Sequence, residues 1–423
     1  MPHTVRVPAE AATTQMGLSE PPAGMLRGMR GGAVLRLKRT PRRARRHPWI
    51  FKGDVADVAD VDAGAEVSVV DSGGHFVGRG FYNPGPALCC RIVTWRDEPL
   101  DSALWRRRIE TAVEYRRRII GQTTAVRLVW SEADGLPGLI VDRYGDVLVV
   151  QCLTLGMFRV RADIVRALHT MVGDLPVFNV DEPVPAGLEG FAPLRGWLDT
   201  PGPARAVVEE AGAVGPVRLG VTFGVGHKTG LYLDQRDNRR HVSALAAGRD
   251  VLDAFAYSAG FTCHALAAGA GGAVCIESSA EAAELARENL MLNGAFERAT
   301  LLTENAFDAL RRLEREHRRF GLVVLDPPPF ARGRAAVEAA RRGYKEINLR
   351  SMRLLEPGGI LATFSCSHHV TSDDFEDICR DAAADAGVTL RTRDILAQSA
   401  DHPVLLDVPE TRYLKGLLLE RMS

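Results

Sequence analysis

The sequence lacks the features of a membrane or secreted protein. No stretch of the chain approaches the run of about 20 apolar side chains that a transmembrane helix needs. The first residues lack a basic segment followed by an apolar run, so no signal peptide is evident. We therefore expect a cytoplasmic protein that does not cross a membrane.

Cysteine is scarce and has no regular spacing. Only seven cysteines occur, and an odd number without a pattern in a long chain favours reduced thiols over a disulfide framework. A zinc site would need two close pairs of ligands, such as CxxC and HxxxH. The adjacent pairs Cys89-Cys90 and His368-His369 do not supply that spacing, so the sequence predicts no metal.

Net charge is also absent, since 53 Lys and Arg balance 53 Asp and Glu. This balance excludes a uniformly basic nucleic-acid binder. The basic residues are nevertheless concentrated, because the segment from Arg27 to Lys52 contains ten Lys or Arg and no acid. Such a block can contact RNA phosphates, or it can be a solvated tail with one exposed edge. The candidate RNA contacts are Arg42, Arg43, Arg45 and Arg46.

Composition and periodicity divide the chain into four parts, of which the first three precede a C-terminal domain. Residues 1–32 are rich in Ala, Gly, Pro and Met without a period, which indicates a disordered segment. Residues 33–100 contain short β-branched runs separated by turn signals, a pattern typical of a small β-barrel. Residues 101–215 begin with a helix over 101–120, with arginines at 106–108 and 116–118 on its exposed sides. They continue as an α+β central domain without a catalytic cluster.

The last part, residues 216–423, has the alternation of a Rossmann-like domain. Apolar strands alternate with helices, so we expect an α/β fold with a mostly parallel sheet. The expected strands cover residues 251–253, 273–277, 300–302, 322–326 and 360–365. Ligands of such sheets bind beyond the carboxyl ends of the strands, so the polar residues at those ends are the candidate site.

Four polar side chains end these strands, namely Asp253, Glu277, Asn305 and Asp326. Glu277 follows Asp253 by 24 residues, a spacing that suits an acid bound to a ribose diol. NAD would need G-x-G-x-x-G after the first strand, but only Gly260 is present. NAD is therefore disfavoured, and the methyl donor S-adenosylmethionine stays open. Taken singly, either acid could simply cap a strand end.

Several segments carry a resemblance to a known family. They are residues 47–51 (HPWIF), 131–143 (SEADGLPGLIVDR), 228–239 (KTGLYLDQRDNR), 326–330 (DPPPF), 364–367 (FSCS) and 401–404 (DHPV). Through them, residues 33–423 resemble the PUA-domain-containing bacterial family of large-subunit (23S) ribosomal RNA cytosine-5 methyltransferases. The resemblance implies a PUA-like RNA-binding domain and a class I methyltransferase domain. It also implies S-adenosylmethionine as cofactor and ribosomal RNA as partner.

The resemblance also assigns site residues. It implies that Gln235 joins the strand-end residues in cofactor binding, and that Asp326 and Cys366 lie in the two active-site motifs. Phe255 is a further candidate cofactor residue because of its position just after the first strand. The family usually carries Asp where this chain has Asn305, whose amide oxygen can still accept a hydrogen bond from an adenine amino group. The loop after the first strand reads FAYSAG, where the family more often has a Thr-Gly-Gly-like run.

The chemistry of cytosine gives these residues their expected roles. Carbon 5 is a poor nucleophile, and a thiolate that adds to carbon 6 activates it. Cys366 and Asp326 end neighbouring strands about 4.8 Å apart, so both can face one base. Asp326 could donate or relay a proton at N3, and Phe330 could stack on the base. Cys366 could instead be a small buried hydrophobe, and His368 and His369 could lower its pKa or form a polar loop.

Two alternatives stay open at the level of sequence. An acid followed by two prolines and an aromatic residue also suits methylation of an RNA base nitrogen, on guanine or an exocyclic amine, without a cysteine. The third hypothesis is a non-catalytic RNA-binding protein that uses the barrel, although Asp253, Glu277, Asp326 and Cys366 together speak against it. The oligomeric state is open as well, a homodimer included.

Overall fold

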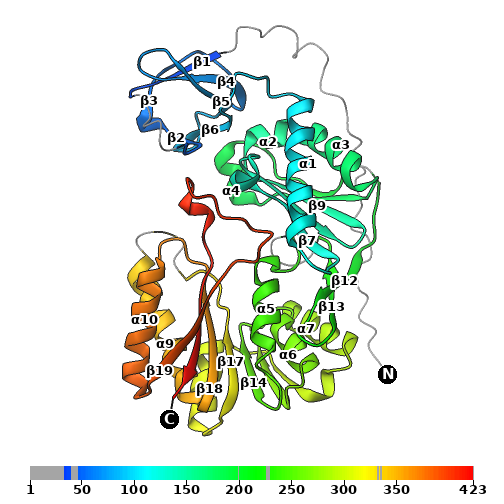
Figure 1. The fold of residues 1–423 in the computed structure, drawn as a ribbon, viewed down its shortest axis with the longest axis vertical. Coiled ribbons are helices and arrows are strands. Elements are labelled where there is room, and N and C mark those ends of the chain that lie inside the picture. The colour runs from blue at the N-terminus through cyan, green and yellow to red at the C-terminus, as the bar shows by residue number, and fades with distance from the viewer. Residues whose placement is uncertain are drawn as a thin grey trace, which may run out of the picture.

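The structure is a computed structural model that describes residues 33–39, 46–198, 200–224, 229–330, 333 and 336–422. Segment 1–32 and the candidate RNA contacts Arg42, Arg43 and Arg45 lie outside the described residues. Figure 1 shows a small β domain in blue, a central α/β part in cyan and green, and a large sheet with helices at the C-terminal end. The predicted fold class is confirmed.

The N-terminal β domain is a six-stranded sheet in the order β2-β6-β5-β4-β1-β3. Its strands are β1 (Ala33–Leu37), β2 (Trp49–Phe51), β3 (Val55–Val58), β4 (Ala65–Val70), β5 (Phe76–Tyr82) and β6 (Leu88–Thr94). Burial alternates strictly along β1, where Leu35 and Leu37 are buried while Val34 and Arg36 are exposed. Because side chains alternate between the faces of a strand, this pattern gives the domain one apolar core and one solvated face.

Helix α1 (Ser102–Ile119) connects this domain to the central part. Asp101 caps it by accepting hydrogen bonds from the backbone amides of Ala103 and Leu104, which satisfies two free N–H groups of the first turn. The expectation that all the arginines of this helix are exposed is wrong for Arg116. That side chain is buried and donates to the backbone oxygens of Arg127 and Asp401. A helix-face pattern cannot reveal such a buried guanidinium, because its partners come from distant segments.

The central part contains a five-stranded sheet in the order β11-β10-β9-β8-β7 and a separate two-stranded hairpin. The strands are β7 (Ala125–Trp130), β8 (Leu139–Tyr144), β9 (Val147–Cys152), β10 (Val177–Val180), β11 (Arg195–Trp197), β12 (Arg205–Ala211) and β13 (Pro216–Thr222). The helices are α2 (Leu155–Arg159), α3 (Arg161–Val172) and α4 (Pro183–Glu189). Strands β12 and β13 form the hairpin, and the boundary expected at residue 216 lies at the start of β13.

The C-terminal part is built on a seven-stranded sheet in the order β16-β15-β14-β17-β18-β20-β19. Its strands are β14 (Asp250–Ala254), β15 (Gly272–Ile276), β16 (Ala299–Leu302), β17 (Phe320–Leu325), β18 (Leu355–Ser365), β19 (Leu390–Ala397) and β20 (Lys415–Arg421). The helices are α5 (Arg236–Ser243), α6 (Gly260–Ala267), α7 (Ala280–Leu292), α8 (Ala306–Arg315), α9 (Val337–Leu354) and α10 (Ser372–Ala386). The first five strands run parallel, while β20 inserts antiparallel between β18 and β19.

Apolar clusters cover both faces of this sheet. Strand β17 is therefore buried along its whole length, as its continuous apolar sequence predicts. The strand order reverses at β14, which lies between β15 and β17, and such a reversal opens a crevice at the carboxyl ends. Every helix in the described ranges is too short or too polar to span a bilayer.

Candidate active site

Three predicted site residues meet where the sheet order reverses. Asp253 lies near the end of β14, Glu277 follows β15 directly, and Asp326 follows β17 directly. Because β15 and β17 both pair in parallel with β14, these three carboxyl ends share one edge of the sheet. The structure thus brings the predicted strand-end acids together.

Asp253 is buried, and among the described residues only one of its two carboxylate oxygens has hydrogen-bond partners. Its Oδ2 accepts hydrogen bonds from the amide and the hydroxyl of Thr262, at 3.2 and 2.7 Å. Its Oδ1 is buried without a hydrogen-bond partner among the described residues. Burial raises the pKa of Asp253 to about 6, and the nearby charge of Glu277 adds to this rise. A buried oxygen without a partner is costly, so it is an acceptor available to a bound ligand.

The loop after β14 has an unusual backbone. Phe255, Tyr257 and Ala259 have φ angles of 65°, 48° and 56°, in the left-handed region that favours glycine. Each costs roughly 1–2 kcal/mol, and such strain gathers at ligand sites. This is the segment in which the sequence departs from the glycine-containing run of the family it resembles.

Glu277 holds this loop in place. One carboxylate oxygen accepts from the backbone amide of Tyr257 at 2.9 Å, and the other accepts from that of Ser279 at 2.8 Å. The Tyr257 hydroxyl in turn donates to the backbone oxygen of Gly230 at 3.1 Å. Carboxylate oxygens have further lone pairs, so Glu277 can still accept from a ribose diol.

Aromatic rings line the neighbouring part of the site. Phe255, Phe307 and Phe330 pack with centroid distances of 5.8 to 6.4 Å. Asn305 is exposed and caps α8, because its Oδ1 accepts from the amide of Phe307 at 2.9 Å. Phe330 also packs on Tyr344, with the ring centroids 4.7 Å apart. The sequence interpretation missed Phe307, which carries no signal except that it closely follows Asn305.

Asp326 and Gln235 form a hydrogen-bonded chain. Gln235 Nε2 donates to Asp326 Oδ1 at 2.9 Å, and Asn238 Nδ2 donates to Gln235 Oε1 at 2.6 Å. Gln235 lies just before α5, and Asn238 lies within it. The segment 229–239 therefore fixes the orientation of the acid that begins the DPPPF motif.

Cys366 lies next to the same motif. It follows β18, which pairs in parallel with β17, and its Sγ is 3.9 Å from the backbone oxygen of Pro327. Of the seven cysteines, all within the described ranges, Cys366 is partly exposed and the other six are buried. The predicted neighbourhood of Cys366 and Asp326 is thus present, and only this thiol is open to a substrate.

The loop after β18 is anchored on two sides. The Tyr344 hydroxyl and the Ser367 hydroxyl are 2.9 Å apart, and Lys415 Nζ donates to the backbone oxygen of Ser367 at 2.7 Å. Burial lowers the pKa of His368, and the charge of Lys415 lowers it further. This shift favours the neutral imidazole of His368, which makes it a poor source of positive charge for the thiol. Sequence reasoning also missed Lys415 and Tyr344.

The acidic residues of segment 131–143 form ion pairs that stabilise the fold. Arg127 binds Asp142 in a bidentate pair at 2.7 and 2.8 Å, and Arg116 pairs with Asp134. Asp142 also accepts from the hydroxyl of Thr229, at the start of the segment that leads to Gln235. Asp142 therefore links the central sheet to the C-terminal part.

The basic N-terminal domain is tied to both other parts. Trp49 Nε1 donates to Glu132 of the central part at 2.8 Å, and His47 Nε2 lies 3.1 Å from Glu410 of the C-terminal part. Lys38 and Lys52 are exposed, and each donates a hydrogen bond to a backbone oxygen. Arg46, the one predicted RNA contact within the described ranges, is also exposed.

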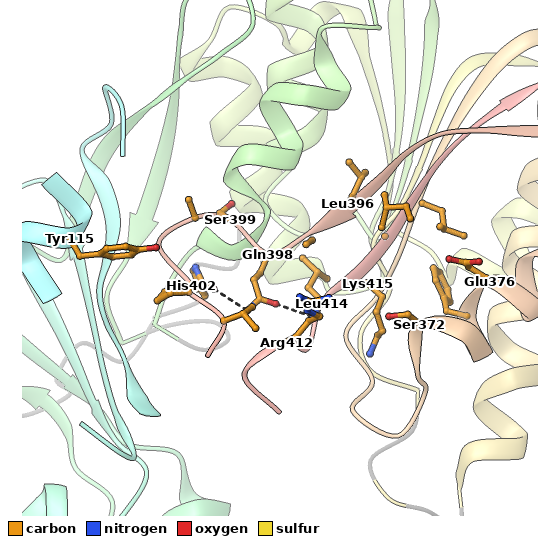
Figure 2. A pocket seen from close by; sticks show the side chains of 18 residues that line it. Tyr115, Ser372, Glu376, Leu396, Gln398, Ser399, His402, Arg412, Leu414 and Lys415 are labelled. Atoms are coloured by element: carbon orange, nitrogen blue, oxygen red, sulfur yellow. Dashed lines mark hydrogen bonds between the residues drawn. The ribbon is translucent and has the colours of Figure 1, made fainter. Parts of the chain in front are cut away.

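A cavity of about 370 Å³ lies between β19, β20, α10 and α1. Figure 2 shows Lys415, Arg412 and Gln398 along it, with Tyr115 of α1 at one side. The described residues that line it include none of the predicted cofactor or catalytic residues. The cavity is therefore separate from the crevice at Asp253.

Comparison with known families agrees with this architecture. Residues 34–95 match the model of a PUA-like domain, and residues 203–419 match that of an S-adenosylmethionine-dependent methyltransferase. A relative from Alteromonas mediterranea named ribosomal RNA large subunit methyltransferase I is 37% identical over 93% of this chain and 99% of its own. One of the same name from Klebsiella pneumoniae is 37% identical over 88% and 94%.

Solved structures show the same fold. One described as a methyltransferase complexed with SAH is 19% identical and has a TM-score of 0.78, over 92% of this chain and 99% of its own. Another, described as a SAM-dependent methyltransferase from Streptococcus mutans, is 19% identical and has a TM-score of 0.75, over 88% and 95%. The matched sequence, the fold and the crevice agree, and the chain belongs to the S-adenosylmethionine-dependent methyltransferase family, with S-adenosylmethionine as its cofactor.

Proposed function

We propose that this protein methylates carbon 5 of a cytosine in large-subunit ribosomal RNA and that Cys366 is the covalent nucleophile. The names of its relatives support the RNA substrate. The observation that carries the cytosine-5 assignment is the partly exposed Cys366 thiol, 3.9 Å from the backbone oxygen of Pro327, beside Asp326. A base held between Cys366 and Asp326 is in reach of both groups.

The cofactor pocket proposed here combines the strand ends with the strained loop. S-adenosylmethionine supplies an electrophilic methyl group when bound. Glu277 accepts from its ribose, and the unpartnered Oδ1 of Asp253 offers a second acceptor. Asn305 receives the adenine amino group beside the apolar wall of Phe255, Phe307 and Phe330. The full set of proposed cofactor residues is Gln235, Asp253, Phe255, Glu277, Asn305 and Asp326.

The Cys366 thiolate adds to carbon 6, which gives carbon 5 the electron density to accept a methyl group. Asp326, held by Gln235, donates or relays a proton at N3, so negative charge does not build up on the ring. After transfer, a base removes the proton of carbon 5, the carbon–sulfur bond breaks and the thiolate leaves, while N3 returns its proton to Asp326. Phe330 remains the proposed stacking partner of the substrate base, in addition to its packing against Phe255.

RNA binding is proposed for the PUA-like domain. Exposed Arg46, Lys38 and Lys52 support it, and Arg42, Arg43 and Arg45 extend the same basic segment in the sequence. Contacts of this type orient RNA through its phosphates and leave base selection to the catalytic site. We place the protein in the cytoplasm with its ribosomal substrate. The proposed absence of a metal and the homodimer remain predictions for metal analysis and analytical ultracentrifugation.

The experiment is methyl transfer to unmodified large-subunit RNA followed by nucleoside mass spectrometry. The proposal predicts 5-methylcytidine. A product methylated on a base nitrogen would favour direct attack at the Asp326 motif instead. Binding of S-adenosylmethionine and RNA without any transfer to large-subunit RNA would favour a non-catalytic RNA-binding role.

A further inference from the structure

Strand β20 places a lysine next to the loop after β18 that carries Cys366 and Ser367, called the catalytic loop below. Strand β20 pairs antiparallel with β18, and in this register Lys415 lies opposite Ser365. Its Nζ donates to the backbone oxygen of Ser367 at 2.7 Å. Lys415 therefore pairs with one residue that flanks Cys366 through its strand and with the other through its amine, and it fixes the backbone that carries the thiol.

The lysine and the thiol also interact electrostatically. Burial lowers the pKa of Lys415, and its interaction with Cys366 opposes that effect by raising the pKa. A desolvated ammonium is poorly screened by water, so its attraction for a nearby thiolate is stronger than at an exposed surface. The same attraction favours loss of the proton from sulfur.

Among the described residues, the tyrosines that interact with the thiol do not supply this charge. Tyr232 and Tyr413 interact with Cys366, but burial raises the pKa of both phenols, so they are neutral at pH 7. Burial also raises the pKa of Tyr344 of α9, so this phenol is neutral at pH 7 as well. Asp326 faces the site from the end of β17, and its carboxylate would oppose a thiolate.

We propose that Lys415 is a positioning residue for Cys366, which holds the catalytic loop through Ser367 and stabilises the thiolate form of the nucleophile. This inference rests on the proposed function of Cys366. Lys415 reaches the loop from the side of the cavity of about 370 Å³, where Arg412 also lies (Figure 2). Arg412 is exposed and donates no side-chain hydrogen bond to the catalytic loop among the described contacts, so it provides a matched control.

The test measures the rate at which iodoacetamide alkylates Cys366 as a function of pH, without RNA or cofactor. The other six cysteines are buried, and Cys366→Ser gives their background. Because only the thiolate reacts, the midpoint of the profile reports the pKa of the thiol. Lys415→Met should move the midpoint upward by about one pH unit and slow alkylation at pH 7 about tenfold. Lys415→Arg should restore most of the profile, and Arg412→Gln should leave it unchanged.

An unshifted midpoint in Lys415→Met, or an equal shift in Arg412→Gln, would overturn the inference. Circular dichroism shows whether each variant is folded. If Lys415→Met is not folded, the alkylation midpoints of Lys415→Gln and Lys415→Arg are compared instead. Both keep a hydrogen-bond donor, but only arginine keeps the charge. Methylation retained in Cys366→Ala would remove the proposed function without changing the alkylation result, so the two failures are distinguishable.

Discussion

Replacement of Glu277 by alanine tests the cofactor site most sharply. The carboxylate accepts one hydrogen bond on each oxygen, from Tyr257 N and Ser279 N, and it is the proposed acceptor for the ribose. Loss of a hydrogen bond to a charged group costs about 1.5–3 kcal/mol, which corresponds to a roughly 10- to 150-fold weaker affinity. Because Glu277 also anchors the strained loop at Tyr257, the loss should fall toward the upper end of this range.

Isothermal titration calorimetry with S-adenosylmethionine measures this change directly. Glu281→Ala is the matched control, since Glu281 is an exposed acid in the first turn of α7 and has no hydrogen bond to the loop among the described contacts. It removes the same charge nearby, so it should leave the affinity within about twofold, as expected for a screened surface charge. Equal affinity of Glu277→Ala and the parent protein, or an equal loss in both variants, would show that Glu277 does not bind the cofactor.

Three further predictions concern strain, ionisation and RNA. Ala259→Gly should raise the free energy of unfolding by about 1 kcal/mol in chemical denaturation, because glycine relieves the φ of 56°. The pKa of about 6 for Asp253 exceeds its unfolded value of about 3.9, so the folded state binds the extra proton and stability should fall as pH rises from about 4 to about 6. Asp253→Asn should abolish that slope in urea titrations of the cofactor-free protein. Charge reversal within residues 42–46 should weaken RNA binding and reduce its salt dependence in filter-binding assays, whereas an unaltered slope would make the segment a solvated tail.

The sequence predicted those parts of the site that follow from local pattern and from parallel topology. Apolar runs located the strands of the parallel sheet, and their ends located Asp253, Glu277 and Asp326. The neighbourhood of Cys366 and Asp326 followed because β17 and β18, which are consecutive in the chain, pair side by side.

Other features depend on contacts between distant segments and could not be predicted. Lys415 reaches the catalytic loop because β20 inserts antiparallel between β18 and β19, and a local pattern does not encode that pairing. The burial of Arg116 likewise depends on backbone oxygens far away in sequence. The positive φ angle of Phe255 has no sequence signal, since glycine is the usual marker of that conformation.

The proposed mechanism requires a covalent bond between Cys366 and the target cytosine. The most direct measurement is trapping on RNA that carries 5-fluorocytosine at the target, in the presence of S-adenosylmethionine. Fluorine cannot leave carbon 5 as a proton does, so the carbon–sulfur bond should persist and give a protein–RNA band on a denaturing gel. We expect this band for the parent protein and its absence in Cys366→Ala, with S-adenosylmethionine binding retained. A band of equal intensity in Cys366→Ala, or full methylation of normal RNA by that variant, would contradict it.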